Sequence, residues 1–355
     1  MSRPFDEIDQ LCVNTVRVLA VDAVENAKSG HPGLPMGAAP MAHVLWTRYL
    51  RHNPAEPHWP GRDRFVLSGG HGCMLLYALL HLTGYDLPME ELKRFRQWGS
   101  RTPGHPEYGH TPGVETTTGP LGQGAANAVG MAIAGTHLAG RFGDAAGFRV
   151  FSLVTDGDLM EGVSGEASSL AGHLGLGNLV FLYDDNHVTI DGDTELAFTE
   201  DRVGRYRAYG WHTIEVDDGN DMEAIDAALE EAVAHTGQPV MIAVKTVIGF
   251  GSKDAGTSRA HSDARGPEQQ AETKRALGFD PDKQFFVPPE VYDRYREALP
   301  RGADLQREWE QRIEQSPSAG ELKRIYADEL PSPLELPSFA PDDGPMATRA
   351  ASGKV

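Results

Sequence analysis

Two apolar runs near the middle of the sequence each end in side chains that carry oxygen ligands. The run 150–154 leads into the sequence TDGD, which begins at Thr155, and the run 179–182 leads into YDDN, which ends at Asn186. Short apolar runs of this kind predict buried strands, and the carboxyl ends of parallel strands meet at one edge of a sheet. Mg²⁺ prefers carboxylate, amide, carbonyl and phosphate oxygens. The pattern therefore predicts a cation and a diphosphate group at that edge, with Asp156 as the carboxylate.

The segment that follows Asp156 also suits an anion. Gly157 allows the backbone to approach a ligand closely. A helix predicted to start near Glu161 would add free N–H groups and the positive end of a helix dipole. Glu161 and Glu166 are equally well explained as ordinary acids stabilised by that dipole, so their role stays open.

Strand-like and helical segments alternate along most of the chain. We predict strands at 64–68, 148–155, 178–183, 212–216 and 239–244, and helices at 6–29, 122–140, 161–174 and 222–235. Gly30 is a plausible C-cap for the first helix. The alternation predicts an α/β fold: a doubly wound, mostly parallel sheet with helices on both faces, whose binding sites lie at the carboxyl ends of the strands.

Charge and composition exclude several classes of protein. The net charge of −19 argues against a nucleic-acid partner. The only two cysteines, Cys12 and Cys73, lack the spacing of a metal site and fit a reducing compartment without disulfides. No signal-like N-terminus and no apolar run of about 18 residues occurs, so we expect no membrane span and a cytoplasmic location.

The composition changes after residue 265. Residues 1–265 are expected to form the α/β domain, and residues 266–330 are expected to form a charged, aromatic, helical extension. Residues 331–355 are expected to be a linker, because five prolines occur between 331 and 345. The segment 346–352 is typical of the first turn of a further helix, and we expect it to lead toward a domain that this sequence does not contain.

Four histidines stand in loops rich in glycine, proline and other small residues. They are His31, His71, His105 and His261. Each one alone is explained as a surface or satisfied loop histidine, whereas four such loops in one α/β domain favour a shared role. Histidine binds anions and transfers protons near neutral pH. No close histidine, cysteine or glutamate spacing indicates a transition-metal site.

A glycine-punctuated turn at 117–124 precedes a helix of small residues. The helix is best explained by tight core packing, and its small side chains would also permit close packing against a symmetry mate. The turn is better explained as a ligand-binding loop, because glycines let the backbone approach a bound group.

Taken together, these motifs resemble transketolase. The runs that carry the resemblance are 29–33, 68–71, 99–106, 117–124 and 245–249, with the Asp-Gly pair at 156 and the Asp-Asn pair at 185. The likeness covers about residues 8–260, which are similar to the family's N-terminal, diphosphate-side thiamine-diphosphate-binding domain, and continues into the interdomain linker. The Asp-Gly and Asn motif is shared by other thiamine-diphosphate enzymes, whereas the histidine loops distinguish transketolases from 2-oxo acid decarboxylases.

The resemblance implies a role for each matching position. The implied metal ligands, for Mg²⁺ with Ca²⁺ or Mn²⁺ as substitutes, are Asp156, the side chain of Asn186 and the carbonyl of Val188. The implied contacts to thiamine diphosphate are His71, Gly119, Pro120, Leu121, Asp156, Gly157, Asn186 and His261. The implied catalytic residues are His31, His105 and His261, and the implied substrate contacts are His31, His261 and Arg349. Glu161 and Glu166 match acids at the family's dimer interface.

The activity implied is transfer of a two-carbon ketol unit from a ketose phosphate such as xylulose 5-phosphate to an aldose phosphate such as ribose 5-phosphate, a step of the pentose phosphate pathway. In the family, the following domain supplies the glutamate that activates the aminopyrimidine. We therefore expect this chain to be inactive alone and to need a homodimer or a complementary pyrimidine-domain polypeptide. The alternatives are another thiamine-diphosphate enzyme, of the dihydroxyacetone synthase or deoxyxylulose-phosphate synthase type, or a non-catalytic cofactor-binding remnant.

Several positions depart from the family pattern. Thr155 stands where glycine is usual, and Asp158 stands where cysteine or an apolar residue is usual. A second carboxylate beside a diphosphate is unfavourable unless it points away or meets a cation. Between Ser258 and Gly266 only His261 matches the family, because Ser258 and Ser262 interrupt the expected pattern. Donor specificity or affinity is expected to differ accordingly.

Overall fold

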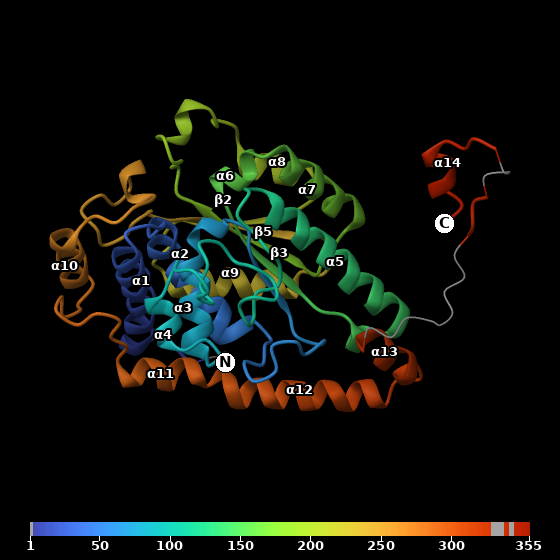
Figure 1. Ribbon diagram of the computed structural model, residues 1–355, viewed down its shortest axis with the longest axis horizontal. Helices are drawn as coiled ribbons and strands as arrows, with labels where there is room; N and C mark the ends of the chain where they lie inside the picture. The colour runs from blue at the N-terminus through green and yellow to red at the C-terminus, as the bar shows by residue number, and fades with distance from the viewer. Residues whose placement is uncertain (1–2, 328–336, 341–343) are drawn as a thin grey trace.

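The protein is built around a five-stranded sheet in which every neighbouring pair of strands is parallel (Figure 1). The computed structural model describes residues 3–327, 337–340 and 344–355, so the parts of the predicted linker at 331–336 and 341–343 lie outside the described residues. The sheet order is β1 (Arg64–Leu67), β2 (Val150–Thr155), β3 (Leu179–Asp185), β5 (Val240–Lys245) and β4 (His212–Val216). All five strands lie where the sequence predicts them, and the doubly wound α/β fold is confirmed.

Successive side chains of a strand point to opposite sides of the sheet, so apolar strands give the sheet two apolar faces. Helices cover both of these faces. In β3, Val180 and Leu182 belong to one core, while Phe181 and Tyr183 belong to the other. The first core is covered by α1 (Glu7–Ala27), α2 (Gly33–Val44), α3 (Cys73–Thr83) and α9 (Met222–Ala234). The second is covered by α5 (Gln123–Phe142), α6 (Asp156–Met160), α7 (Gly162–Leu174) and α8 (Arg202–Ala208) (Figure 1).

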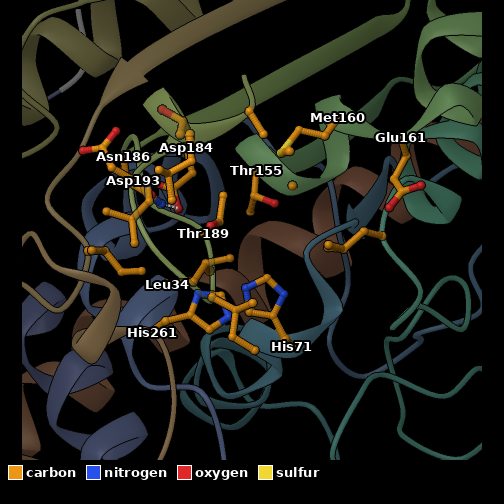
Figure 2. Close-up of a pocket in the computed structure, with 18 of the residues that line it drawn as sticks. Leu34, His71, Thr155, Met160, Glu161, Asp184, Asn186, Thr189, Asp193 and His261 are labelled. Atoms are coloured by element: carbon orange, nitrogen blue, oxygen red, sulfur yellow. Dashed lines mark hydrogen bonds between the residues drawn. The ribbon is translucent and has the colours of Figure 1, made fainter. Parts of the chain in front are cut away.

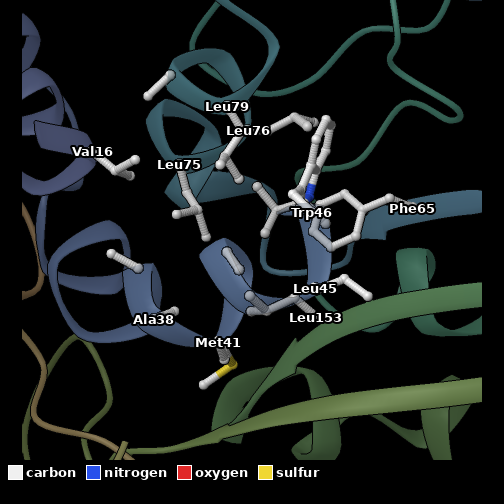
Figure 3. Packing of buried hydrophobic residues seen from close by; sticks show 14 of the residues in the cluster. Val16, Ala38, Met41, Leu45, Trp46, Phe65, Leu75, Leu76, Leu79 and Leu153 are labelled. Carbon is white, nitrogen blue, oxygen red and sulfur yellow. The ribbon is translucent and has the colours of Figure 1, made fainter. Parts of the chain in front are cut away.

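The larger core is packed around Trp46, which is 2% exposed. This residue lies in a π-helical turn, η1 (Leu45–Tyr49), that continues α2. Its ring meets that of Phe65 on β1 edge to face, with ring centroids 5.5 Å apart. Figure 3 shows Leu75, Leu76 and Leu79 of α3 beside this pair. Aromatic burial of this kind fixes α2 and α3 against the sheet, and so fixes the loops that follow α1 and β1.

The first helix ends earlier than the sequence predicts. Its C-cap is Lys28, in the left-handed conformation with φ 53°, and the Lys28 N–H reaches the carbonyls of Val24 and Glu25. The prediction that Gly30 is the C-cap is therefore wrong. Gly30 (φ 145°) is instead required by packing, because a Cβ there would lie 2.7 Å from Val24 Cγ2. The chain thus turns at Lys28 and runs closely past α1 toward His31.

The remaining helices are α4 (Met89–Lys93), α10 (Pro267–Ala276), α11 (Pro289–Arg296), α12 (Ala298–Glu314), α13 (Ala319–Tyr326) and α14 (Thr348–Ser352). A fully buried ion pair between Lys274 Nζ and Asp22 Oδ1, 2.9 Å apart, joins α10 to α1. Val291 and Tyr295 of α11 belong to the larger core. Figure 1 shows α14, the helix predicted at 346–352, apart from the rest of the chain.

Both cysteines, Cys12 and Cys73, are buried free thiols. Among the helices of the described residues, none combines the length and the apolar character that a bilayer crossing requires.

Candidate functional site

A cavity of about 400 Å³ opens at the carboxyl ends of the strands (Figure 2). Its walls come from segments that follow four strands: His71 after β1, Gly157 after β2, Asn186 after β3 and Ile248 after β5. Small-molecule sites in proteins commonly have volumes of about 300–1,000 Å³. The site therefore lies at the edge of the sheet that the sequence pattern indicates, and it is large enough for an organic ligand.

The end of β2 passes directly into a helix. Thr155 is the N-cap of α6, and its Oγ1 accepts a hydrogen bond from the Asp158 N–H at 3.3 Å. The helix predicted at 161–174 is confirmed as α7, whose N-cap is Glu161, with extended backbone (φ −76°, ψ 136°). The short helix α6, which precedes it, is not predicted from the sequence. A threonine followed three residues later by an acid forms a capping box, which starts a helix at once. Gly157 therefore lies in the first turn, beside the cavity.

Gly157 is needed for the approach of the neighbouring loop. A Cβ at this position would lie 2.9 Å from Cδ1 of Leu121. Gly119 and Leu121 line the cavity together with Gly157, whereas Pro120 does not line it. The wall between α5 and α6 is thus formed by two glycine-containing turns in direct contact.

Asp158 points away from the cavity and is completely buried. Its Oδ1 accepts hydrogen bonds from Ser68 Oγ at 2.7 Å and from the Gly122 N–H at 2.8 Å. Its Oδ2 accepts from the Thr155 N–H at 2.9 Å and from Thr155 Oγ1 at 3.0 Å. Burial raises the pKa of Asp158, and these donors oppose that rise. The expected conflict between this carboxylate and a diphosphate does not arise, since Asp158 joins β1, β2 and the turn at 119–122.

The three positions implied as metal ligands lie together at the ends of β2 and β3. Asp156 Oδ1 accepts from the Tyr183 hydroxyl at 2.5 Å, and its Oδ2 accepts from the His187 N–H at 3.0 Å. Asn186 Oδ1 accepts from the Val188 N–H at 2.9 Å. Asn186 and Val188 line the cavity, while Asp156, 1% exposed, lies behind the wall.

Burial raises the pKa of Asp156, and the Tyr183 hydroxyl opposes this rise. A cation beside this buried carboxylate would favour its charged form. Within the part of the chain that the structure describes, no group of three or more His, Cys, Asp and Glu side chains is arranged to hold a metal. A cation at this edge would therefore depend on one carboxylate with amide and carbonyl oxygens, which is a donor set suited to a hard ion.

The four loop histidines form one cluster. The rings of His71 and His261 are stacked, with centroids 4.9 Å apart, and both line the cavity (Figure 2). The His31 ring lies 5.3 Å from His71, 5.4 Å from His261 and 6.4 Å from His105. His31 and His105 do not line the cavity themselves. Four loops far apart in the sequence thus meet beside the cavity, which separate surface histidines would not do.

Burial keeps these histidines neutral at pH 7. It lowers the pKa of His31 to about 4 and that of His71 well below its usual value, and the neighbouring histidines add to both shifts. Burial also lowers the pKa of His105 and of His261. Neutral imidazoles can donate a hydrogen bond from one nitrogen and accept one at the other. The cluster therefore offers both donors and acceptors to a polyhydroxylated ligand.

Arg349 is exposed on α14 and lies outside the cavity wall. Conversely, several lining residues were not predicted as contacts. They are Leu34, Thr155, Met160, Glu161, Asp184, Thr189, Ile190, Asp193, Thr194, Leu196, Ala197 and Ile248. Leu34 follows the predicted loop at 29–33 directly, so its neighbourhood was an available signal. The segment 187–197 has no helical or strand period, and only its scattered apolar residues, Val188, Ile190, Leu196 and Ala197, indicate a wall.

Comparisons with known proteins give a consistent result. The family profile described as "Transketolase, thiamine diphosphate binding domain" matches residues 8–331. The transketolase of Geobacillus stearothermophilus is 51% identical over 362 residues, which cover 98% of this chain and 54% of the relative. Transketolase 2 of Saccharomyces cerevisiae is 51% identical over 365 residues, covering 99% and 53%. The chain thus spans about half the length of the curated relatives it matches.

Solved structures agree with the sequence matches. A transketolase from Pichia stipitis, in complex with sedoheptulose-7-phosphate, superposes with a TM-score of 0.93 and 46% identity, over 97% of this chain and 53% of that one. A transketolase from Leishmania mexicana superposes with a TM-score of 0.91 and 47% identity, over 95% and 52%.

Proposed function

Because the chain belongs to the transketolase family, we propose that it holds the diphosphate end of thiamine diphosphate for the transfer of a two-carbon ketol unit between sugar phosphates. The observation that carries the proposal is the cavity, around which Gly119, Gly157, Asn186 and two of the four clustered histidines are brought together. The relatives are transketolases, so neither another thiamine-diphosphate enzyme nor a non-catalytic remnant is favoured. The proposed donor is xylulose 5-phosphate and the proposed acceptor is ribose 5-phosphate.

Residues on both sides of the cavity would hold the cofactor. The proposed diphosphate contacts are His71, Gly119, Pro120, Leu121, Asp156, Gly157, Asn186 and His261. The proposed ligands of Mg²⁺, for which Ca²⁺ or Mn²⁺ would substitute, are Asp156, the Asn186 amide oxygen and the Val188 carbonyl. When bound, thiamine diphosphate supplies an electron sink for the carbon–carbon bond that breaks.

The histidine cluster is proposed to orient the sugar. Neutral imidazoles at His31, His105 and His261 would hydrogen-bond the substrate hydroxyls and move protons near neutral pH, with no buried charge to neutralise. Arg349, with an exposed guanidinium, is proposed to hold the sugar phosphate, because its planar fork matches a phosphate group.

The complete active site is proposed to need a second polypeptide surface. Large apolar side chains are exposed beside the cavity and along α7: Met160 at 42%, Leu170 at 45%, Leu174 at 47%, Ile190 at 61% and Leu196 at 78%. Exposed apolar surface of this kind is typical of an interaction site. We propose that a second copy or a complementary pyrimidine-binding polypeptide covers it, with Glu161 and Glu166 at the contact, and that the assembled enzyme works in the cytoplasm in the pentose phosphate pathway.

Calorimetric titration of thiamine diphosphate into the chain, with and without Mg²⁺, tests the cofactor proposal. We expect cation-dependent binding that Asp156→Asn weakens at least tenfold, while Asp304→Asn, an exposed control on α12, leaves it unchanged. Cofactor binding that ignores both Mg²⁺ and Asp156 would contradict the proposal. Ketol transfer should appear only after the pyrimidine-binding half is added, and turnover by the chain alone would overturn the proposed division of the site.

A further inference from the structure

The guanidinium of Arg96 lies against the ring of His31. Nη2 of Arg96 is 3.2 Å from His31 Nδ1, and Nη1 donates to Ser29 Oγ at 2.8 Å. Nη2 also donates to the Gly104 carbonyl at 3.4 Å. A guanidinium carries only donors and stays protonated in proteins. Nδ1 of His31 must therefore accept the hydrogen bond, which leaves the single ring proton on Nε2.

We infer that Arg96 is a positioning residue that fixes His31 in the Nε2–H tautomer, so that this imidazole offers a hydrogen-bond donor on the side away from Arg96. Among the described residues, Nε2 of His31 has no hydrogen-bond partner. The His31 ring adjoins His71 and His261, which line the cavity. The tautomer itself does not depend on the proposed function. The further statement that the His31 Nε2–H donates to an oxygen of a ketose substrate rests on that function.

The backbone around Arg96 is held in a conformation that arginine rarely adopts. Its φ is 60°, in the left-handed region, and its N–H donates to the Thr102 carbonyl at 3.0 Å. Such a conformation persists only where the surroundings enforce it. Gly104 leaves room for the guanidinium, because a Cβ there would lie 3.1 Å from Arg96 Nε. The loop thus keeps Arg96 aimed at His31 and, through Gly104, keeps the adjacent His105 in place.

The charges around His31 also favour the neutral ring. The titratable groups that face it are Arg96, His71, His105, His261 and Asp263. Burial, His261 and Arg96 lower the pKa of His31, while Asp263 opposes them. A second proton would have to sit on Nδ1, directly opposite a guanidinium. Arg96 therefore acts on His31 in two ways: it donates a hydrogen bond to Nδ1, and its positive charge opposes a second positive charge on the ring.

Nitrogen NMR of the ring tests the inference without any activity measurement. The chain is labelled with ¹⁵N at histidine, and two-bond ¹H–¹⁵N spectra at pH 7 report which ring nitrogen carries the proton. His31→Gln identifies the His31 signals by their loss. We expect an unprotonated Nδ1 in the wild type. In Arg96→Met we expect an increased Nδ1–H population and a rise of about 1 unit in the pKa of His31.

Two further variants separate this role from a loss of folding. Arg96→Lys keeps a charged donor and should retain most of the wild-type pattern, whereas Arg94→Met, an exposed control on the same loop, should leave His31 unchanged. A protonated Nδ1 in the wild type overturns the inference, and so does an Arg96→Met spectrum identical to the wild type. Should Arg96→Met not fold, the wild-type and Arg96→Lys spectra decide. An assembled enzyme without ketol transfer would count against the proposed function and not against the tautomer.

Discussion

The buried carboxylate of Asp158 gives the sharpest stability prediction. It accepts four hydrogen bonds, from Ser68, from Gly122 and two from Thr155. In Asp158→Asn, an amide oxygen at the Oδ1 position can keep the hydrogen bonds from Ser68 and Gly122. The amide NH₂ then takes the Oδ2 position and faces the Thr155 N–H, and two donors cannot form a hydrogen bond with each other. Hydrogen bonds to charged groups contribute about 1.5–3 kcal/mol each.

Part of that loss is recovered, because burial raises the pKa of Asp158 and the neutral amide avoids the cost of a buried charge. We therefore expect Asp158→Asn to lower the free energy of unfolding by about 2 kcal/mol. In Asp158→Ala the donors on Ser68, Gly122 and Thr155 are all left without an acceptor. We expect about 4 kcal/mol there, the upper range for single substitutions.

Urea unfolding at pH 7, followed by circular dichroism, measures both values. The control is Asp304→Asn, which removes an exposed carboxylate paired only with Arg307 and should change stability by less than about 0.5 kcal/mol. The reasoning is refuted if Asp158→Asn matches this control, or if Asp158→Ala is no less stable than Asp158→Asn. Either result would mean that the four contacts do not hold the turn at 119–122 in solution.

Three further predictions concern other parts of the chain. Lys274→Met should lower the free energy of unfolding by about 3–5 kcal/mol, because it leaves the buried carboxylate of Asp22 without its cation. Adding Asp22→Asn should restore much of the lost stability. Urea unfolding of the single and the double variant measures both effects. Burial lowers the pKa of His52 to about 3, so the unfolded state takes up the proton first, and stability is lost as the pH falls from about 6.5 toward 3. His52→Gln should therefore reduce the slope of the unfolding free energy against pH by up to about 1.4 kcal/mol per pH unit between pH 4 and 6. An unchanged slope would contradict this prediction. Gly157→Ala would place a Cβ 2.9 Å from Leu121 Cδ1. Calorimetry should therefore show that the variant binds the cofactor at least about tenfold more weakly than the wild type. An affinity equal to that of the wild type would contradict this prediction.

Much of the fold follows from the sequence, for a clear physical reason. The strands β1, β2, β3 and β5 are short, mainly apolar runs, and a strand buried on both faces needs apolar residues at successive positions rather than alternate ones. The edge strand β4 is more polar and half-buried. The observed bounds of the five strands differ from the predicted ones by no more than two residues. The edge that carries the cavity also follows, because parallel strands that end in Asp156 and Asn186 leave those residues side by side.

The sequence misplaces the end of α1 and misses the short helix α6, and both errors have local causes that composition does not reveal. Glycine is the residue most common where a helix ends, which is why the sequence favours Gly30 as the C-cap. The helix ends at Lys28 instead, because the Lys28 N–H reaches the carbonyls of Val24 and Glu25. The start of α6 was missed because Asp and Gly directly after a strand are typical of a loop. The capping box between Thr155 and Asp158 reverses that preference.

Side-chain direction lies further beyond the sequence. Neither the orientation of Asp158 nor the contact between Arg96 and His31 follows from spacing, because both join segments separated by many residues. The lining of the cavity by the segment 187–197 is equally hidden, since that segment has no regular period. Such contacts are set by how the loops pack at the end of the sheet.

Thr155 and Asp158, the two residues at the end of β2 that are expected to differ from the family pattern, form a single structural unit. The hydroxyl of Thr155 bonds Asp158, and the methyl group of Thr155 lies where a Cβ on Gly69 would come within 2.8 Å of it. Asp158 in turn finds two of its four donors on Thr155. Taken singly, a threonine at position 155 takes up room at the cavity wall, and an aspartate at position 158 would add a charge near the proposed diphosphate. Taken together, they cap α6 and direct the carboxylate toward Ser68 and Gly122, away from the cavity. Thr155 and Asp158 are therefore expected to depend on each other, because each makes its hydrogen bonds at the start of α6 with the other.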